Sequence, residues 1–224
     1  MKIKAIITGS TGMVGKGILL ECLENPNVET VLVVNRKTIG TKHEKLKEII
    51  HKDFYNLEEI ENELEDYNAC YFSLGISSIG MSEEDYTKIT YDLAINFAKT
   101  LLEKNKEMTF CYVSGAGTDS SEKGKTMWAR VKGKTENAIL AMPFKNSFAF
   151  RPAYIQPIGE VKSKTRLYDF GIQIAKHLYP ILKVIFPNHT TTSQAIGKAM
   201  INVVLNGYEQ RVIESKDINI LAKN

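Results

Sequence analysis

The sequence predicts an α/β fold with a parallel, doubly wound sheet, helices on both faces and a small C-terminal helical cap. Three observations predict it. Short apolar, β-branched runs alternate with segments whose apolar residues recur at helical spacing, a pattern typical of parallel βα units. A glycine-rich turn joins the first run to the first helical segment. The chain has 224 residues, 43% hydrophobic and 25% charged, which suits one large domain with a substantial core.

The glycine turn organises the N-terminal part of the chain. Ile3 to Thr8 is an apolar run that indicates a buried strand, and Gly9, Gly12 and Gly15 follow it at regular spacing. In such a turn the first glycine permits a tight bend, the second lets a pyrophosphate approach the backbone, and the third allows the helix to pack on the strand. The helix N-terminus adds free N–H groups and a partial positive charge. We therefore predict a dinucleotide site here.

The end of the second strand suggests which dinucleotide is bound. Thr30 to Val34 is the predicted strand, and Asn35, Arg36 and Lys37 follow it, about 20 residues beyond the glycine turn, where the residue that contacts the ribose belongs. An NAD-selective site would place Asp or Glu there. Two cations suit a 2′-phosphate instead, so NADP(H) is expected over NAD(H). The alternative is that both cations are simply solvated.

Two further strands end with polar or small residues at the same predicted edge. Leu46 to His51 is the third strand, and Asp53 follows it. This Asp either reaches the adenine edge or caps a helix that begins near Leu57. Ala69 to Leu74 is the fourth strand, and its end carries Ser73, Leu74 and Gly75. Ligands bind at the carboxyl edge of open α/β sheets, so these residues are candidates for cofactor contacts.

The remaining elements continue the alternation. A long helix begins at Ser82 with a capping pattern, and an apolar stripe along it predicts core packing; the stripe is Ile89, Leu93, Phe97 and Leu101. The later predicted elements are strand Thr109–Val113, helix Met127–Ala141, strand Ser147–Phe150, helix Gln194–Leu205 and edge strand Gln210–Ile213. We expect a single domain over residues 1–224, with residues 160–190 as a small cap on the substrate side.

Taken together, these motifs resemble the short-chain dehydrogenase/reductase superfamily in its atypical branch. The resemblance is to NAD-dependent epimerase/dehydratase-like proteins and to Tat-interacting short-chain-dehydrogenase-like proteins. It rests on Thr8 to Gly15, Ser73 to Gly75, Val113-Ser114, Lys132, and Arg151-Pro152 with Gly159 beyond. It implies a Rossmann fold and an NAD(P) cofactor. With the residues discussed above, the expected cofactor contacts are Gly9, Ser10, Thr11, Gly12, Met13, Val14, Gly15, Asn35, Arg36, Lys37, Asp53, Ser73, Leu74, Gly75, Lys132, Pro152, Ala153, Tyr154 and Ile155.

One position departs from the family. Active members carry Tyr-x-x-x-Lys, in which the lysine holds the nicotinamide ribose and lowers the pKa of the tyrosine that exchanges the proton. This chain keeps Lys132 but has Trp128 where the tyrosine should stand, and an indole N–H only donates. The resemblance implies Lys132 and Ser114 as catalytic candidates. Tyr154 and Tyr91 are the candidate proton donors that replace the missing phenol.

The expected function is an NADPH-dependent oxidoreductase acting on a small carbonyl or quinone-like substrate. The alternative is a weakly active or inactive NADP(H)-binding redox sensor or interaction protein. Peripheral membrane contact of residues 168–186 is a third reading, although cap packing is the commoner fate of such a segment. A net charge of +3 with interspersed signs predicts no nucleic-acid binding, and no transmembrane segment is expected. A homodimer remains open.

The cysteines and histidines bear on location and metals. Cys22, Cys70 and Cys111 have no CxxC spacing and fall in predicted buried elements, so reduced thiols in a cytoplasmic protein are expected. The four histidines are scattered and none pairs with a cysteine at ligand spacing. We therefore expect no metal site.

Overall fold

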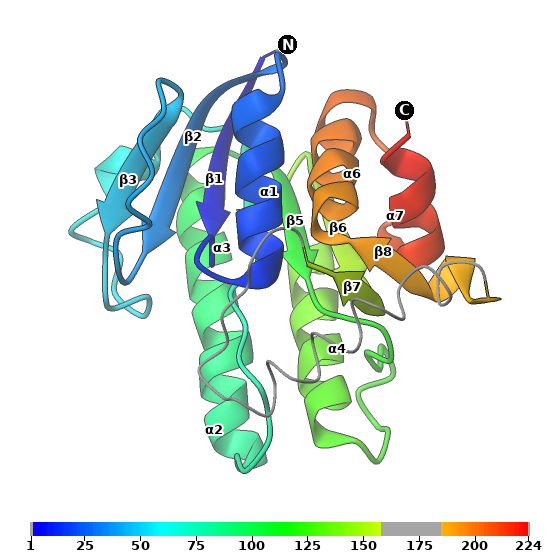
Figure 1. The fold of residues 1–224 in the computed structure, drawn as a ribbon. Coiled ribbons are helices and arrows are strands. Elements are labelled where there is room, and N and C mark those ends of the chain that lie inside the picture. The colour runs from blue at the N-terminus through cyan, green and yellow to red at the C-terminus, as the bar shows by residue number, and fades with distance from the viewer. Residues whose placement is uncertain (1, 158–184, 224) are drawn as a thin grey trace.

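The computed structural model describes residues 2–157 and 185–223 (Figure 1). Most of the predicted cap at 160–190, and with it nearly all of the segment 168–186, lies outside these residues, as does Gly159. The proposal that the cap closes over the substrate site therefore stays a prediction.

A seven-stranded parallel sheet forms the centre of the molecule, in the order β3-β2-β1-β4-β5-β6-β9. The chain starts in the middle, builds one half outward to β3, then crosses to build the other half. This reversal beside β1 creates the crevice in which doubly wound folds bind ligands. The prediction of a parallel, doubly wound Rossmann sheet is confirmed. The strands are β1 (Ile3–Thr8), β2 (Val28–Asn35), β3 (Leu46–Ile50), β4 (Ala69–Phe72), β5 (Thr109–Val113), β6 (Asn146–Arg151) and β9 (Val212–Glu214).

Helices cover both faces of the sheet (Figure 1). Buried side chains of α1 (Met13–Glu24), α6 (Ser193–Asn206) and α7 (Ser215–Leu221) share one apolar cluster with one sheet face. Those of α3 (Leu93–Lys104) and α4 (Met127–Ala141) share the other. A short α2 (Glu83–Thr87) runs into α3 through one π-helical turn, Lys88–Asp92. Two 3₁₀ turns, Glu61–Leu64 and Pro187–His189, and a small parallel pair, β7 (Tyr154–Gln156) with β8 (Thr190–Thr192), complete the described residues.

The predicted helix near Leu57 is wrong. The chain forms turns there and then the 3₁₀ helix Glu61–Leu64. Polar side chains bind the local backbone instead: Asp53 Oδ1 accepts the Tyr55 N–H at 2.9 Å, and Asn56 Oδ1 accepts the Glu58 N–H at 2.9 Å. Such bonds compete with helical ones. Asp53 therefore caps a turn and not a helix.

Candidate dinucleotide and catalytic site

The glycine turn between β1 and α1 depends on the absence of side chains. Gly9 has φ of +71°, and a Cβ there would lie 2.8 Å from the Ser73 backbone. A Cβ on Gly15 would lie 2.2 Å from the Gly9 carbonyl oxygen. Gly12 differs, because its Cβ would meet only the Gly9 oxygen, at 3.3 Å, and it is exposed at the N-cap of α1. The first and third glycines thus shape the turn, while the second leaves the helix N-terminus open to a ligand.

Buried polar side chains hold this turn in place. Ser10 and Asn35 exchange hydrogen bonds of 2.8 and 3.0 Å, and both are nearly inaccessible to solvent. The Ser73 hydroxyl donates to the Thr8 carbonyl at 2.6 Å. Three residues expected to contact the cofactor therefore connect the ends of β1, β2 and β4 to one another. Their placement stabilises the turn that would receive the phosphates.

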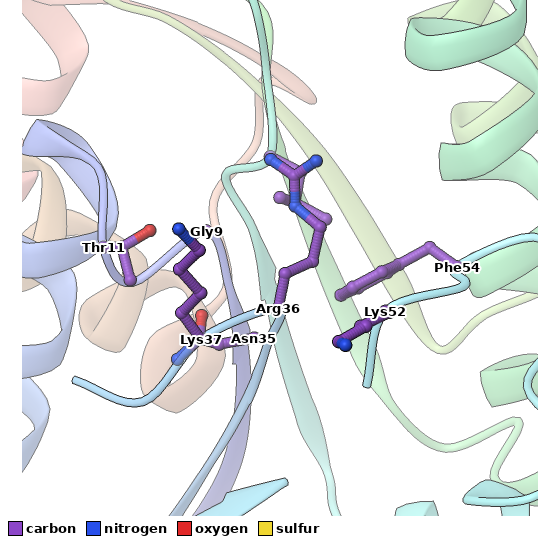
Figure 2. Close-up of a pocket in the computed structure, with 8 residues that line it drawn as sticks. Gly9, Thr11, Asn35, Arg36, Lys37, Lys52 and Phe54 are labelled. Atoms are coloured by element: carbon purple, nitrogen blue, oxygen red, sulfur yellow. The ribbon is translucent and has the colours of Figure 1, made fainter. Parts of the chain in front are cut away.

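A cavity of about 640 Å³ lies beside the glycine turn, and we call it the cationic cavity. It is lined by Gly9, Thr11, Asn35, Arg36, Lys37, Lys52, Phe54 and Leu74. Figure 2 shows the Arg36 and Lys37 side chains extending between the glycine turn on one side and Phe54 with Lys52 on the other. Three of these described lining residues carry a positive charge and none carries a carboxylate. A cavity with this charge suits anionic groups such as the phosphates of a dinucleotide.

An adjoining cavity of about 370 Å³ shares Arg36, Lys52, Phe54 and Leu74 with the cationic cavity, and we call it the apolar cavity because most of its other side chains are apolar. Asp53, Tyr55, Gly75 and Ile76 contribute to it as well. Two residues of the predicted core stripe, Ile89 and Leu93, also line it. Ile89 is 38% exposed and lines this cavity from the π-helical turn, so its predicted core packing is wrong. The apolar side chains of this cavity suit a flat ring such as adenine.

A third cavity of about 490 Å³ lies at the ends of β5 and β6, and we call it the lysine cavity. Its lining residues are Ile76, Ser77, Ser78, Tyr86, Ser114, Gly115, Ala116, Trp128, Lys132, Pro152 and Ala153. The Lys132 ammonium donates a hydrogen bond to the Ser114 carbonyl. Burial lowers the pKa of Lys132 to about 8, although the nearby Glu136 carboxylate opposes this change. Lys132, Ser114 and Trp128 thus line one cavity, and their catalytic role stays a prediction.

Glu136, which accepts a hydrogen bond from Ser114, was not predicted from the sequence. Glu136 is 1% exposed. Arg151 forms an ion pair with it, and its Nε lies 3.0 and 3.1 Å from the two carboxylate oxygens of Glu136. The Ser114 hydroxyl also donates to Glu136, and lies 3.1 Å from the Phe150 carbonyl. A glutamate one helical turn after Lys132, on the same face of α4, was the available signal. The Arg151–Glu136 ion pair and the Ser114 hydrogen bond to Glu136 thus connect α4 with β6 and with the end of β5.

The two tyrosine candidates are not among the described residues that line the lysine cavity. Tyr154 is in β7, and its hydroxyl donates to Gln156 Oε1 at 2.9 Å. The Tyr91 ring lies under the Lys134 ammonium, 4.4 Å from its centroid. Three expected cofactor residues are placed as follows: Met13 begins α1, and Val14 and Ile155 pack against the apolar cluster beneath α1.

Three comparisons with known proteins bear on this site. Residues 7–100 match the NAD-binding family described as "Male sterility protein". Among curated proteins, "Protein FMP52, mitochondrial" of Meyerozyma guilliermondii is 23% identical over 98% of this chain and 95% of its own length. The protein of the same name from Debaryomyces hansenii is 31% identical over 66% of this chain and 65% of its own length.

Solved structures share the fold at low identity. The Bordetella bronchiseptica enzyme WbmF, solved with NAD+, aligns with a TM-score of 0.68 and 12% identity over 98% of this chain and 77% of that one. UDP-N-acetylglucosamine 4-epimerase from Methanobrevibacter ruminantium aligns with a TM-score of 0.67 and 14% identity over 95% and 76%. The chain therefore shares the fold of these enzymes, and its residues 7–100 are similar to an NAD-binding family.

One expectation is overturned by these relatives. The predicted cytoplasmic location is contradicted, because the FMP52 proteins are named mitochondrial.

Among the helices that the structure describes, none is long and apolar enough to cross a bilayer. Within residues 2–157 and 185–223, no three His, Cys, Asp or Glu side chains are grouped to hold a metal ion. The three cysteines are buried and free.

Proposed function

We propose that this protein binds NADP(H) in preference to NAD(H) and uses it to reduce a small carbonyl or quinone-like substrate. The observation that supports the cofactor choice best is the cationic cavity. Arg36 and Lys37 follow β2, Lys52 follows β3, and no carboxylate accompanies them among the described lining residues. A 2′-phosphate gains charge-assisted hydrogen bonds from such a set, whereas a 2′-hydroxyl lacks the carboxylate partner that NAD sites provide.

Each part of the site has a distinct role in this proposal. The open N-terminus of α1 beside Gly12 receives the pyrophosphate, the apolar cavity receives the adenine, and Lys132 holds the nicotinamide ribose. The bound cofactor supplies the hydride. The lysine cavity, which lies at the ends of β5 and β6, holds the substrate carbonyl. Its lining by Trp128, Tyr86 and Ile76 favours a small, partly apolar substrate.

A second candidate function has its own supporting observation. Trp128 lines the lysine cavity at the position where active relatives carry a tyrosine, and its N–H is a poor acid near neutral pH. A protein that binds NADP(H) without turning it over would serve as a redox sensor or interaction protein. Measuring whether the protein consumes NADPH with a substrate separates this candidate from the first.

Calorimetry and steady-state kinetics test the proposal. NADPH should bind at least tenfold more tightly than NADH, a difference of about 1.4 kcal/mol. Arg36→Ala should reduce that ratio. Lys47→Ala removes one cation from an exposed position of β3; it is the matched control and should leave the ratio unchanged. Consumption of NADPH over a panel of aldehydes, ketones, enones and quinones then decides between reductase and sensor. Equal affinity for the two cofactors would refute the assignment of the cationic cavity.

A further inference from the structure

The lysine cavity lacks a phenol at the family position, so a proton for the substrate oxygen must come from another group. Trp128 offers only an indole N–H. The Ser114 hydroxyl has a single proton, and it is donated to the Glu136 carboxylate. Tyr91 lies under Lys134, and Tyr154 donates to Gln156. Lys132 is the cationic side chain among the described residues that line this cavity.

The geometry holds the Lys132 ammonium at the cavity wall. Its Nζ donates one hydrogen bond to the Ser114 carbonyl at the end of β5. An ammonium has three donors, so within the described part of the chain two remain for the cavity. Ser114 is itself held by Glu136 and the Phe150 carbonyl. The position of the nitrogen is thus set by the backbone of the sheet, and not by a flexible surface contact.

Burial lowers the pKa of Lys132, so that its ammonium can release a proton near neutral pH. Glu136 is its neighbour on α4, but Arg151 of β6 takes both carboxylate oxygens, and no ion pair joins Lys132 to Glu136 among the described residues. Tyr86 of α2 also lines the cavity, and burial raises its pKa. Burial raises the pKa of Tyr112 on β5 as well. Loss of hydration favours the neutral amine and outweighs the opposing charge of Glu136 in the pKa of Lys132.

We propose that the Lys132 ammonium is itself the acid of the reaction and protonates the substrate oxygen in place of the missing phenol. This inference rests on the proposed function and names the proton donor of that same site. As the carbonyl carbon gains hydride, the oxygen takes a proton from Nζ. One N–H bond breaks, one O–H bond forms, and the electron pair stays on the amine nitrogen, which recovers a proton from solvent. Glu136 and Arg151 act as positioning residues through Ser114.

The kinetic test compares Lys132→Arg with Lys134→Arg. Arginine keeps the charge but does not release its proton near neutral pH, so Lys132→Arg should lower kcat by roughly 100-fold while NADPH affinity, measured by calorimetry, changes by less than about threefold. Lys134→Arg makes the same change two residues away on α4, over the Tyr91 ring, and should leave both quantities unchanged. In the wild type, kcat should fall as pH rises above about 8, and this descending arm should vanish in Lys132→Arg.

A second measurement needs neither turnover nor a variant. Competitive acetylation of the wild-type protein without cofactor, over a pH series and read by peptide mass spectrometry, reports the titration of each lysine. Lys132 should titrate near pH 8. A Lys132 titration above 10 would overturn the inference, as would a larger loss of kcat in Tyr86→Phe than in Lys132→Arg. Failure to bind NADPH would instead overturn the proposed function, and failure to consume it would overturn both.

Discussion

Gly12→Asp is expected to weaken dinucleotide binding by roughly 30-fold while leaving the fold intact. Gly12 is the N-cap of α1, with φ −84° and ψ 166°, a conformation that any L-residue adopts. The nearest atom to an added Cβ is the Gly9 oxygen at 3.3 Å, so only a small adjustment is needed. Asp is also a favoured N-cap residue, and it differs from Gly there by only a few tenths of a kcal/mol. The variant should therefore unfold at nearly the wild-type temperature.

The loss of affinity comes from charge and volume at the phosphate position. Two like charges about 4 Å apart interact by about 4 kcal/mol at an effective dielectric constant near 20. Because Gly12 is exposed, we take about half of that, roughly 2 kcal/mol, which corresponds to a ~30-fold rise in Kd for NADPH. The carboxylate also accepts the N–H groups at the start of α1 that the pyrophosphate would otherwise use.

Calorimetry with NADPH measures this loss, and thermal unfolding checks the fold. Gly12→Asn is the matched control, because it has the same shape and a similar capping preference without the charge. It should lose clearly less affinity than Gly12→Asp. If both variants bind NADPH as the wild type does, the pyrophosphate does not lie at this turn. If both lose affinity equally, steric exclusion dominates and the electrostatic reasoning is refuted.

Three further predictions concern α4. Trp128→Tyr places a phenol one turn before Lys132, and NADPH consumption should rise by up to roughly 10²-fold; a slower variant would mean that the indole shapes the substrate site. Gly133→Ala should destabilise the protein by about 3 kcal/mol, since its Cβ would lie 1.8 Å from the Asp119 oxygen, whereas Gly75→Ala, with nothing within 4 Å, should unfold in denaturant almost like the wild type. The folded-state pKa of Lys132 is about 8, below its ordinary value of 10.5. Between these values the unfolded chain binds more protons, so the free energy of unfolding should rise with pH there, and Lys132→Met should remove that rise.

Elements with a strong local signal were predicted closely from the sequence. β1, β5 and α4 have the expected bounds, because a β-branched run or a regular amphipathic repeat favours one backbone conformation wherever it occurs. The edge strand near residue 212 and the helix from Ser193 were predicted to within a few residues. The segment after Asp53 failed, since local side-chain hydrogen bonds competed with a weak helical pattern.

The chemistry at the strand ends was also visible in the sequence. Parallel strands bring their carboxyl ends to one edge, so the glycine turn and the cations Arg36 and Lys37 could be expected together. Lys52 joins them only through the pairing of β3 with β2. The sequence suggested a cation pair, and the folded sheet makes a cavity with three positive charges.

The sequence by itself determined the order of strands and helices, the glycine turn, and the residue types offered at the edge of the sheet. Only the tertiary structure decided which of them face a ligand. Asn35 lines the cationic cavity but is held by hydrogen bonds with Ser10. Ser114 donates its proton to Glu136, which Arg151 binds from a different strand. These partners lie far apart along the chain and meet through sheet pairing and helix packing. Local propensity does not encode such contacts, because burial and charge at a site depend on every element packed around it.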